Sequence, residues 1–273
     1  MNRKIVGAIR PKSFYLGMVI IVLVMLIAVF APFIASYDPH EMMIPYQRPS
    51  RDHLLGTNDV GQDIFSELIY GTRASLFVGL FAAFIITGMG TTLAVLSGYY
   101  RGITDRIISA LTNIAMAIPS LPLTILLVAF LKPGKWNLIL ALSLTGWTGT
   151  ARILRTKTME IAEQPFIKIE KTLGVSNLVI MLKHILPNLK DIVLMRGAMM
   201  ISSVMVTEAS LSFLGLGTYG EKSWGSILRY AFFRNSILRQ FTWWYLPPIL
   251  CISVTVLGFM LVGYYGATDE KTV

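Results

Sequence analysis

Charged residues are scarce in this 273-residue chain, at 14% against roughly 25% in a soluble domain, while hydrophobic residues reach 54%. A soluble fold of this size cannot hide so much apolar side chain, because most of its surface must be polar. The composition therefore excludes a disordered chain, a disulfide scaffold and an ordinary cytosolic enzyme. It indicates a polytopic membrane protein.

Residues that carry chemistry are also few. The single cysteine, Cys251, excludes an intrachain disulfide and a cysteine-cluster metal site. The histidines His40, His53 and His184 lack metal-ligand spacing, and the sequence has no P-loop and no hydrolase motif. Because Glu208 is the only acid near a predicted span, no proton relay is expected. We predict no catalytic, cofactor-binding or metal site here, so energy for uphill transport would enter from another subunit.

Six segments are predicted to cross the membrane, since a helix needs about 20 apolar residues to span about 30 Å of hydrocarbon. The predicted spans are 13–37, 74–100, 107–131, 136–151, 192–213 and 241–268. The basic start of the first segment also fits a signal peptide, but its long apolar run favours an uncleaved anchor. The predicted fold class is an all-α polytopic membrane protein.

The distribution of lysine and arginine predicts the orientation. These residues are more numerous in the inner segments when the N-terminus is placed inside, and segment 152–191 carries half of those on the inner side. Both termini are then cytoplasmic, and 38–73 and 208–240 lie outside. The net charge of +9 is read as this orientation signal, with membrane lipid and not nucleic acid as the partner.

Prolines and small residues within the spans suggest bends and close contacts. Pro119 and Pro122 in the third span, and Pro247-Pro248 in the sixth, remove backbone donors and should bend the helices. Small residues in the second and fourth spans permit close helix packing, or else they line a polar pathway. These residues are Gly88, Gly90, Thr91, Thr92, Gly146, Thr148, Gly149 and Thr150.

The fifth span contains two charges, Arg196 and Glu208, which lie about 18 Å apart along one helix and therefore do not pair. We expect Arg196 near the inner interface and Glu208 near the outer end. Burial of Glu208 would need a partner, for which Arg73, Lys222, Arg229 and a basic residue of another subunit are candidates.

The inner segment, defined here as 152–191, has a helical pattern. A helix is predicted over 159–173, Gly174 should end it, and a second helix over 177–186 should end at Pro187. Such an element on the cytosolic side is suited to transmit force to a soluble partner. The alternative is an amphipathic hairpin that lies on the bilayer.

The inner segment resembles the cytoplasmic "EAA" loop of ABC importer permeases, E-A-A-x3-G-x9-I-x-L-P. Gly174, Leu186 and Pro187 match its glycine, leucine and proline, while His184 takes the isoleucine position. The E-A-A residues themselves are replaced by Lys168, Ile169 and Glu170. The resemblance implies that this segment couples to an ATPase, with Glu170 as a substitute for the leading glutamate.

Two outer stretches resemble signatures of one permease family. Residues 54–76 are similar to H-P-L-G-T-D-x-x-G-R-D-x-x-S-R-L-x-Y-G-x-R-x-S-L, and 208–225 to E-A-A-L-S-F-L-G-L-G…S-W-G. Both belong to the second permease of the dipeptide/oligopeptide/nickel ABC importers (the DppC/OppC/NikC type). The resemblance suggests an outer gate, or else a purely structural role for these stretches. The residues concerned are Gly56, Thr57, Asp59, Gly61, Asp63, Glu208, Gly215, Gly217 and Trp224.

The resemblance covers essentially the whole chain and implies a type I ABC importer permease fold in the cell membrane. The implied division is an anchor helix with an outer loop (1–73), a permease core (74–268) and a cytoplasmic tail (269–273). The implied function is binding-protein-dependent import of di- or oligopeptides, with nickel or a metal chelate as the alternative solute. The implied partners are a homologous sister permease, two cytosolic ATPase subunits that hold ATP and Mg, and an extracytoplasmic solute-binding protein. A non-transporting scaffold or receptor subunit and a self-sufficient carrier remain as alternatives of other classes.

Overall fold

A computed structural model describes residues 11–218 and 220–266, so the predicted tail 269–273 lies outside the described residues. Within them the regular structure is helical, apart from an isolated bridge between Thr57 and Asp63. The helices are α1 (Lys12–Val29), α2 (Ala31–Ile34), α3 (Ile64–Tyr100), α4 (Gly102–Ala117), α5 (Ser120–Leu131), α6 (Lys135–Ala162), α7 (Pro165–Thr172), α8 (Asn177–Ile180), the π-helix η1 (Met181–Ile185), α9 (Leu186–Phe213), α10 (Trp224–Phe233) and α11 (Thr242–Tyr265).

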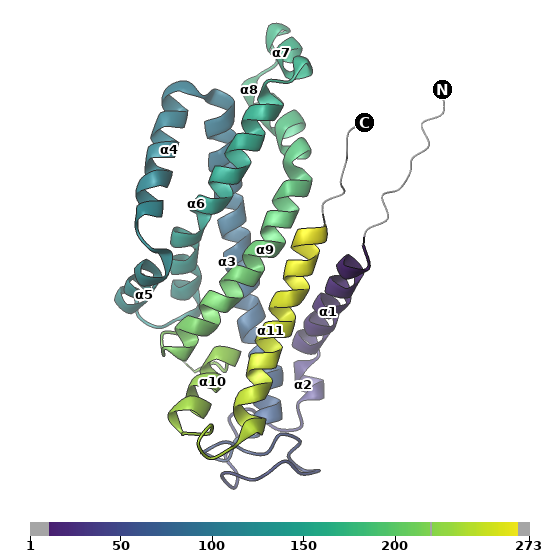
Figure 1. The fold of residues 1–273 in the computed structure, drawn as a ribbon, viewed down its shortest axis with the longest axis vertical. Coiled ribbons are helices and arrows are strands. Elements are labelled where there is room, and N and C mark those ends of the chain that lie inside the picture. Colours follow the sequence, from purple (N-terminus) through teal and green to yellow (C-terminus); the bar gives the residue numbers. More distant parts are fainter. Residues whose placement is uncertain (1–10, 219, 267–273) are drawn as a thin grey trace, which may run out of the picture.

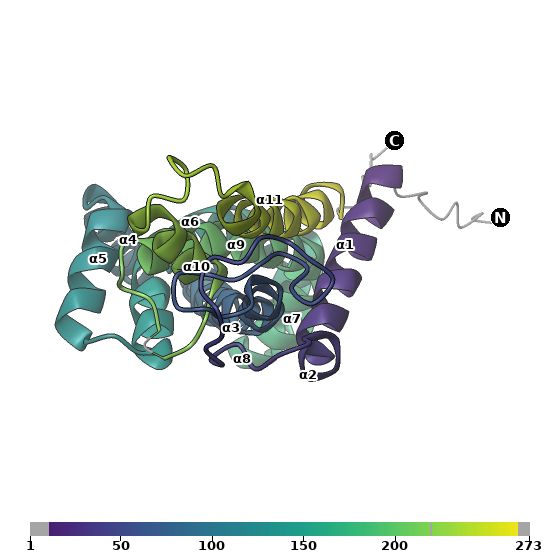
Figure 2. The ribbon, with the colours of Figure 1, turned by 90° about the horizontal axis from the view of Figure 1, so that it is seen from below.

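The long helices α3, α6, α9 and α11 run side by side along the long axis of the molecule (Figure 1). Helix α1 packs on α11 at one flank, and α4 and α5 form the other flank (Figure 2). The short helices α7 and α8 lie at one end of the bundle, and α10 lies with the loop before α3 at the opposite end (Figure 1). The predicted inner and outer segments are thus separated by the length of the bundle.

Four helical stretches of the described chain are long and apolar enough to cross a membrane: α1, α3, Asn177–Phe213 and α11. The pair α4–α5 makes a fifth if it is counted as one span, although its two halves are bent by 86°. The remaining predicted span, 136–151, lies within α6, where Arg152, Arg155 and Lys157 follow it in the same helix. The all-α polytopic class is therefore confirmed, while hydropathy of the described helices does not reproduce the full count of six.

The bend between α4 and α5 is the one predicted from proline. Ile118 has an extended backbone (ψ 127°), as expected for a residue that precedes proline, and Pro119 caps α5. Helix α11 carries Pro247 and Pro248 in its interior.

Glycines bring α3 and α6 into close contact. A Cβ atom at Gly90 would lie 2.8 Å from Cβ of Thr150, and one at Gly98 would lie 2.6 Å from Cβ of Thr158. The packing interpretation is therefore confirmed for Gly90. Gly88 differs, because a Cβ there would meet nothing within 4 Å, and it lines an apolar hollow of about 780 Å³ between α3 and α9.

Proline placement corrects two predictions about the inner segment. The predicted helix 159–173 is wrong, because α6 ends at Ala162 and α7 begins at Pro165 after an extended Gln164. The prediction that Pro187 ends a helix is also wrong, since Pro187 lies in the first turn of α9 and the helix continues. The preceding π-helix η1 is wider than an α-helix, which accommodates the missing donor and the ring of Pro187.

Candidate functional site

Gly174 ends α7 in a left-handed conformation with φ of +78°. The Val175 amide donates to the Glu170 carbonyl at 3.1 Å and the Gly174 amide to the Lys171 carbonyl at 3.1 Å, which is the Schellman pattern. The predicted glycine stop is therefore confirmed. A Cβ at Gly174 would meet nothing within 4 Å, so this turn faces open space.

The inner segment is packed against the end of α3. Ile167, Ile180 and Ile185 are fully buried in a cluster with Val95 and Tyr99 of α3. The Tyr99 hydroxyl also donates to Oδ1 of Asn177 at 2.7 Å. The segment is thus held by the bundle, which fixes the position of its outward face.

The outward face of the inner segment is partly apolar. Ile169 is 59% exposed and Leu173 is 75% exposed, next to the open turn at Gly174. Lys168, at the first position of the altered E-A-A, is also largely exposed. Leu186 and Pro187 are exposed as well, so each of the predicted coupling residues except Glu170 is at or near the surface.

Glu170 makes a contact that the sequence pattern did not reveal. Its Oε2 atom lies 2.9 Å from Nε2 of His184, so α7 and η1 are joined across the Gly174 turn. Phe166 packs beside the same imidazole, with ring centroids 6.4 Å apart. Glu170 replaces the second alanine of E-A-A and His184 replaces the isoleucine. The two residues that depart from the loop pattern are therefore in contact.

A second ion-pair group lies at the C-terminal end of α6. Glu163 is 2.6 Å from Nη1 of Arg101 and 2.9 Å from Nζ of Lys168. The hydrogen bond from Lys168 and the charge of Arg101 hold the pKa of the Glu163 carboxyl below its usual range. Lys168 thus turns back toward the bundle in spite of its exposure.

At the opposite end, Asp63 begins α3. Its Oδ2 accepts hydrogen bonds at 2.8 Å from both the amide and the hydroxyl of Ser66, and its Oδ1 lies 3.0 Å from Nδ1 of His53. This N-cap starts the helix at Ile64, ahead of the span predicted from Ala74, because capping chemistry and not hydropathy sets the first turn.

The loop before α3 is shaped by two glycines and a threonine. Gly56 and Gly61 have φ of +70° and +85°, and a Cβ at either position would clash with a carbonyl oxygen, that of Gln47 or Met43. Thr57 is buried and donates to the Ile44 carbonyl at 2.7 Å. The residues of this turn make backbone contacts within the loop.

A buried ion pair joins the start of α3 to the predicted outer segment 208–240, called here the second outer segment. Lys222 lies 2.7 Å from Oε1 of Glu67, whose side chain is 3% exposed, and it also donates to Oε1 of Gln62 at 2.7 Å. Arg234 makes a second link, to Oδ2 of Asp59 at 2.6 Å. Sequence reasoning missed the pair of Glu67 and Lys222, and no local spacing signals it because the residues are distant in the chain.

Glu208 is buried, with 2% exposure, but its surroundings differ from the prediction. The Ser212 hydroxyl, one turn further along α9, donates to its Oε1 at 2.7 Å, while Oε2 is buried without a hydrogen-bond partner. No ion pair to Glu208 occurs within the described part of the chain, and the candidate Lys222 binds Glu67 instead. The predicted cationic partner within this chain is therefore absent from the structure.

The turn after α9 closes around Ser212. A Cβ at Gly217 would clash with Oγ of Ser212, and Gly215 has φ of +87°. Trp224, at the start of α10, is buried and donates from Nε1 to the Leu68 carbonyl at 3.1 Å. These contacts tie α3, α9 and α10 together at the outer end.

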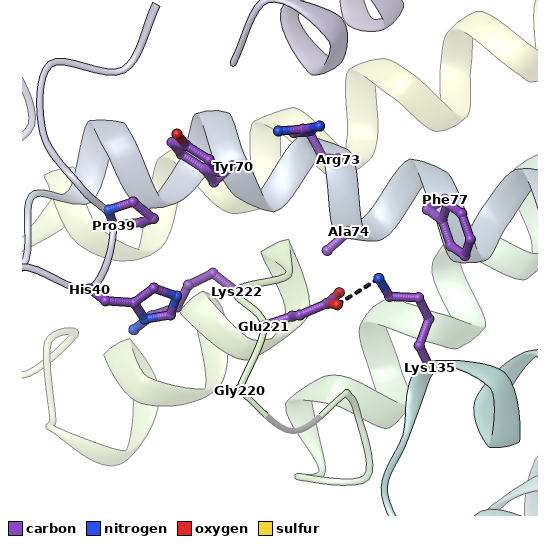
Figure 3. A pocket seen from close by; sticks show the side chains of 10 residues that line it. All are labelled: Pro39, His40, Tyr70, Arg73, Ala74, Phe77, Lys135, Gly220, Glu221 and Lys222. Atoms are coloured by element: carbon purple, nitrogen blue, oxygen red, sulfur yellow. Dashed lines mark ion pairs between the residues drawn. The ribbon is translucent and has the colours of Figure 1, made fainter. Parts of the chain in front are cut away.

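The contacts of Glu67, Lys222, Glu208 and Trp224 at this end are called here the outer network. A cavity of about 320 Å³ lies beside it (Figure 3). Nζ of Lys135 and Oε1 of Glu221 form an ion pair of 2.5 Å within it, and Arg73 and Lys222 contribute further positive charge. Within residues 11–218 and 220–266, no group of three or more His, Cys, Asp or Glu side chains is placed to hold a metal ion.

Comparison with known proteins identifies the family. The family described as "Binding-protein-dependent transport system inner membrane component" matches residues 90–266, and "N-terminal TM domain of oligopeptide transport permease C" matches residues 9–55. The chain is 35% identical to the oligopeptide transport system permease protein OppC of Bacillus subtilis over 255 residues, which is 92% of this chain and 83% of that protein.

Other relatives agree. The dipeptide transport system permease protein DppC of Alkalihalophilus pseudofirmus is 35% identical over 93% of this chain and 84% of its own length. The glutathione transport system permease protein GsiD of Escherichia coli is 36% identical over 89% of this chain and 80% of its own length. An inward-facing structure of the MetNI methionine ABC transporter shares the fold, with a TM-score of 0.56 and 20% identity over 71% of this chain and 94% of that one.

The family consists of membrane permease subunits of ABC importers, in which ATP hydrolysis belongs to a separate subunit. The expected fold and family are therefore confirmed. This chain belongs to the binding-protein-dependent transport system inner membrane components and is the permease subunit of an ABC importer.

Proposed function

We propose that this permease imports di- or oligopeptides, driven by ATP and dependent on a solute-binding protein. The observation that carries the proposal is sequence identity to permeases named for oligopeptide and dipeptide transport. The aligned region covers more than nine-tenths of this chain. The same relatives favour peptides over nickel or a metal chelate as the solute.

The proposed assembly contains this chain, a homologous sister permease, two cytosolic ATPase subunits that hold ATP and Mg, and an extracytoplasmic solute-binding protein. Both termini are cytoplasmic, so that the inner segment meets the ATPases and the loop before α3 meets the binding protein. The predicted division into 1–73, 74–268 and the tail 269–273 remains part of this proposal.

The inner segment is the proposed ATPase-coupling element. Its support is the fixed position of α7 on the bundle together with the exposed apolar side chains of Ile169 and Leu173. Exposed apolar side chains on the surface of a soluble region are typical of an interaction site. The residues assigned to coupling are Lys168, Ile169, Glu170, Gly174, Leu186 and Pro187.

The outer network is the proposed gate. Its support is the hydrogen bond from Trp224 of α10 to Leu68 of α3, together with the contacts of Lys222 with Glu67 of α3 and with Gln62 of the loop before α3. ATPase closure would move the inner segment and open this end, in an alternating-access cycle. The residues assigned to it are Gly56, Thr57, Asp59, Gly61, Asp63, Glu208, Gly215, Gly217 and Trp224.

Reconstitution tests the function. Proteoliposomes that contain the complete complex should accumulate a radiolabelled dipeptide only under two conditions. ATP must be present inside, where the ATPase subunits face the lumen, and the binding protein must be present outside. Uptake without ATP would support a self-sufficient carrier, and nickel uptake without peptide uptake would support the alternative solute. A complex that binds no ATPase would favour the scaffold class.

Cysteine labelling tests the topology. In a Cys251→Ala background, a cysteine at Pro45 or Tyr230 should react with an impermeant thiol reagent added to intact spheroplasts, because both positions are exposed at the outer end. A cysteine at Leu173, which is also exposed, should react only after permeabilisation. Labelling of position 173 from outside would contradict the proposed orientation.

A further inference from the structure

Arg196 is a cation in the membrane-spanning part of α9, and its guanidinium group lies against α6. Its Nη2 atom would be 3.9 Å from a Cβ placed on Gly149, an ordinary contact distance, so the guanidinium group lies beside this part of α6. The Nε atom is buried and has no hydrogen-bond partner. Ion pairs and side-chain hydrogen bonds to Arg196 are also lacking among the described residues.

Arg196 lies deeper than the inner interface at which the sequence would place it. A Cβ on the adjacent Gly197 would lie 3.8 Å from the side chain of Thr87. Thr87 is midway along the uncharged run 74–100 of α3. An arginine at this depth is costly without a counter-charge, and intramembrane charges therefore face a partner or a water-filled path.

The same face of α9 is polar toward the outer end. Ser203, Thr207 and Ser210 follow Arg196 at intervals of about one or two turns, which places all four on one side of the helix. Ser203 is exposed, and Thr207 and Ser210 are half-buried, with hydroxyls bonded only to carbonyls of their own helix. The Thr207 and Ser210 hydroxyls are satisfied within the helix, whereas the unpaired charge of Arg196 on the same face is unfavourable toward lipid, so this face borders water or protein in the assembly.

We propose that Arg196 binds the carboxylate of the transported peptide as it passes along this face of α9. The inference rests on the proposed function, which supplies an anionic group to every unmodified peptide through its C-terminus. A guanidinium group is suited to bidentate hydrogen bonding with a carboxylate. The hydroxyls of Ser203, Thr207 and Ser210 provide a polar route from the outer end to this cation.

Direct binding tests the inference without the binding protein, whose own selectivity would otherwise dominate. The complete permease–ATPase complex in phosphatidylcholine nanodiscs is titrated to millimolar concentration with Ala-Ala and with its C-terminal amide, and binding is followed by saturation-transfer NMR. Wild type should prefer the free acid by about tenfold or more, as expected for a hydrogen bond to a charged group. Arg196→Gln should remove that preference, and Arg196→Lys should keep part of it.

Arg152→Gln is the matched control. Arg152 is a basic residue of α6 near Gly149 that donates to Asn113 at 3.0 Å and is exposed, so its loss should leave the acid-to-amide ratio unchanged. Equal ratios in wild type and Arg196→Gln, or no binding of Ala-Ala to wild type, would overturn the inference.

Two other sources of an anion are distinguished by further arms. If Arg196 binds lipid phosphate, phosphatidylglycerol nanodiscs should change the melting temperature of wild type but not that of Arg196→Gln. The ratio of Ala-Ala binding to amide binding should then be the same in both proteins, and the inference fails. If a carboxylate of the sister permease neutralises Arg196, Arg196→Gln should destabilise the complex and again leave the ratio unchanged. Absence of any peptide uptake by wild-type proteoliposomes would instead refute the proposed function itself.

Discussion

Glu170 and His184 lie 2.9 Å apart, carboxylate oxygen to imidazole nitrogen, on the two sides of the Gly174 turn. Each occupies a position at which the family's cytoplasmic loop pattern has an apolar residue, alanine and isoleucine respectively. The oxygen and the nitrogen lie within ion-pair distance, but Oε2 of Glu170 makes no hydrogen bond, so their attraction is electrostatic and requires a protonated imidazole. The contact places the two departures from the pattern side by side in the folded chain.

The first prediction concerns this contact. His184→Ile alone should lower solute-stimulated ATP hydrolysis in the reconstituted complex, because Glu170 loses its partner and α7 is held less firmly against η1. The double variant Glu170→Ala/His184→Ile, which restores the family pattern, should recover most of the activity. A single variant as active as wild type, or a double variant worse than the single, would show that the contact does not support coupling.

The second prediction concerns the turn at Gly174. Gly174→Ala places a side chain in a left-handed conformation, at a cost of about 1–2 kcal/mol, and should reduce solute-stimulated ATPase activity. Gly174→Asp, which adds a charge to the proposed docking face, should abolish it while the protein remains in the membrane.

Gly220→Ala is the matched control for the turn. Gly220 has φ of +77° and open space around it, as Gly174 does, but it lies in the second outer segment. Its backbone cost should be similar and its effect on ATPase coupling small. Equal losses in the two alanine variants would mean that backbone strain, and not docking, explains the result.

The third prediction concerns the ion pair of Glu67 and Lys222. Lys222→Met should destabilise the outer end by about 3–5 kcal/mol, because it leaves the Glu67 carboxyl buried without its cation. Glu67→Leu/Lys222→Met removes both charges and should recover much of the loss. Thermal unfolding of the purified complex measures the effect, and additive losses in the double variant would argue against the coupling of these residues.

The fourth prediction concerns Glu208. Glu208→Gln keeps the shape of the side chain but replaces its acidic group, so it should disturb the Ser212 contact at this end of α9. We expect raised basal ATPase activity that depends less on binding protein. Glu41→Gln, at an exposed position of the loop before α3, should behave as wild type. Wild-type activity of Glu208→Gln in both assays would assign Glu208 a purely structural role.

The amino-acid sequence by itself determined the features that depend on neighbouring residues. Long uncharged runs identify the spans because hydrocarbon excludes charge, and Gly174 ends its helix because only glycine readily adopts a left-handed turn. The same local chemistry was available at Pro165 and Asp63, which set the ends of α7 and α3. The helix predicted over 159–173 is interrupted at Pro165, because proline disfavours a helical conformation in the residue before it.

Only the tertiary structure decided which distant side chains meet. Lys222 could pair with Glu208 or with Glu67 as far as the sequence shows, and the packing of the second outer segment on the start of α3 selects Glu67. The partner of Glu170 and the depth of Arg196 relative to α3 are settled in the same way. The physical reason is that such pairs form when separate helices pack, and the contact surfaces of helices far apart in the chain are not encoded in local periodicity or charge.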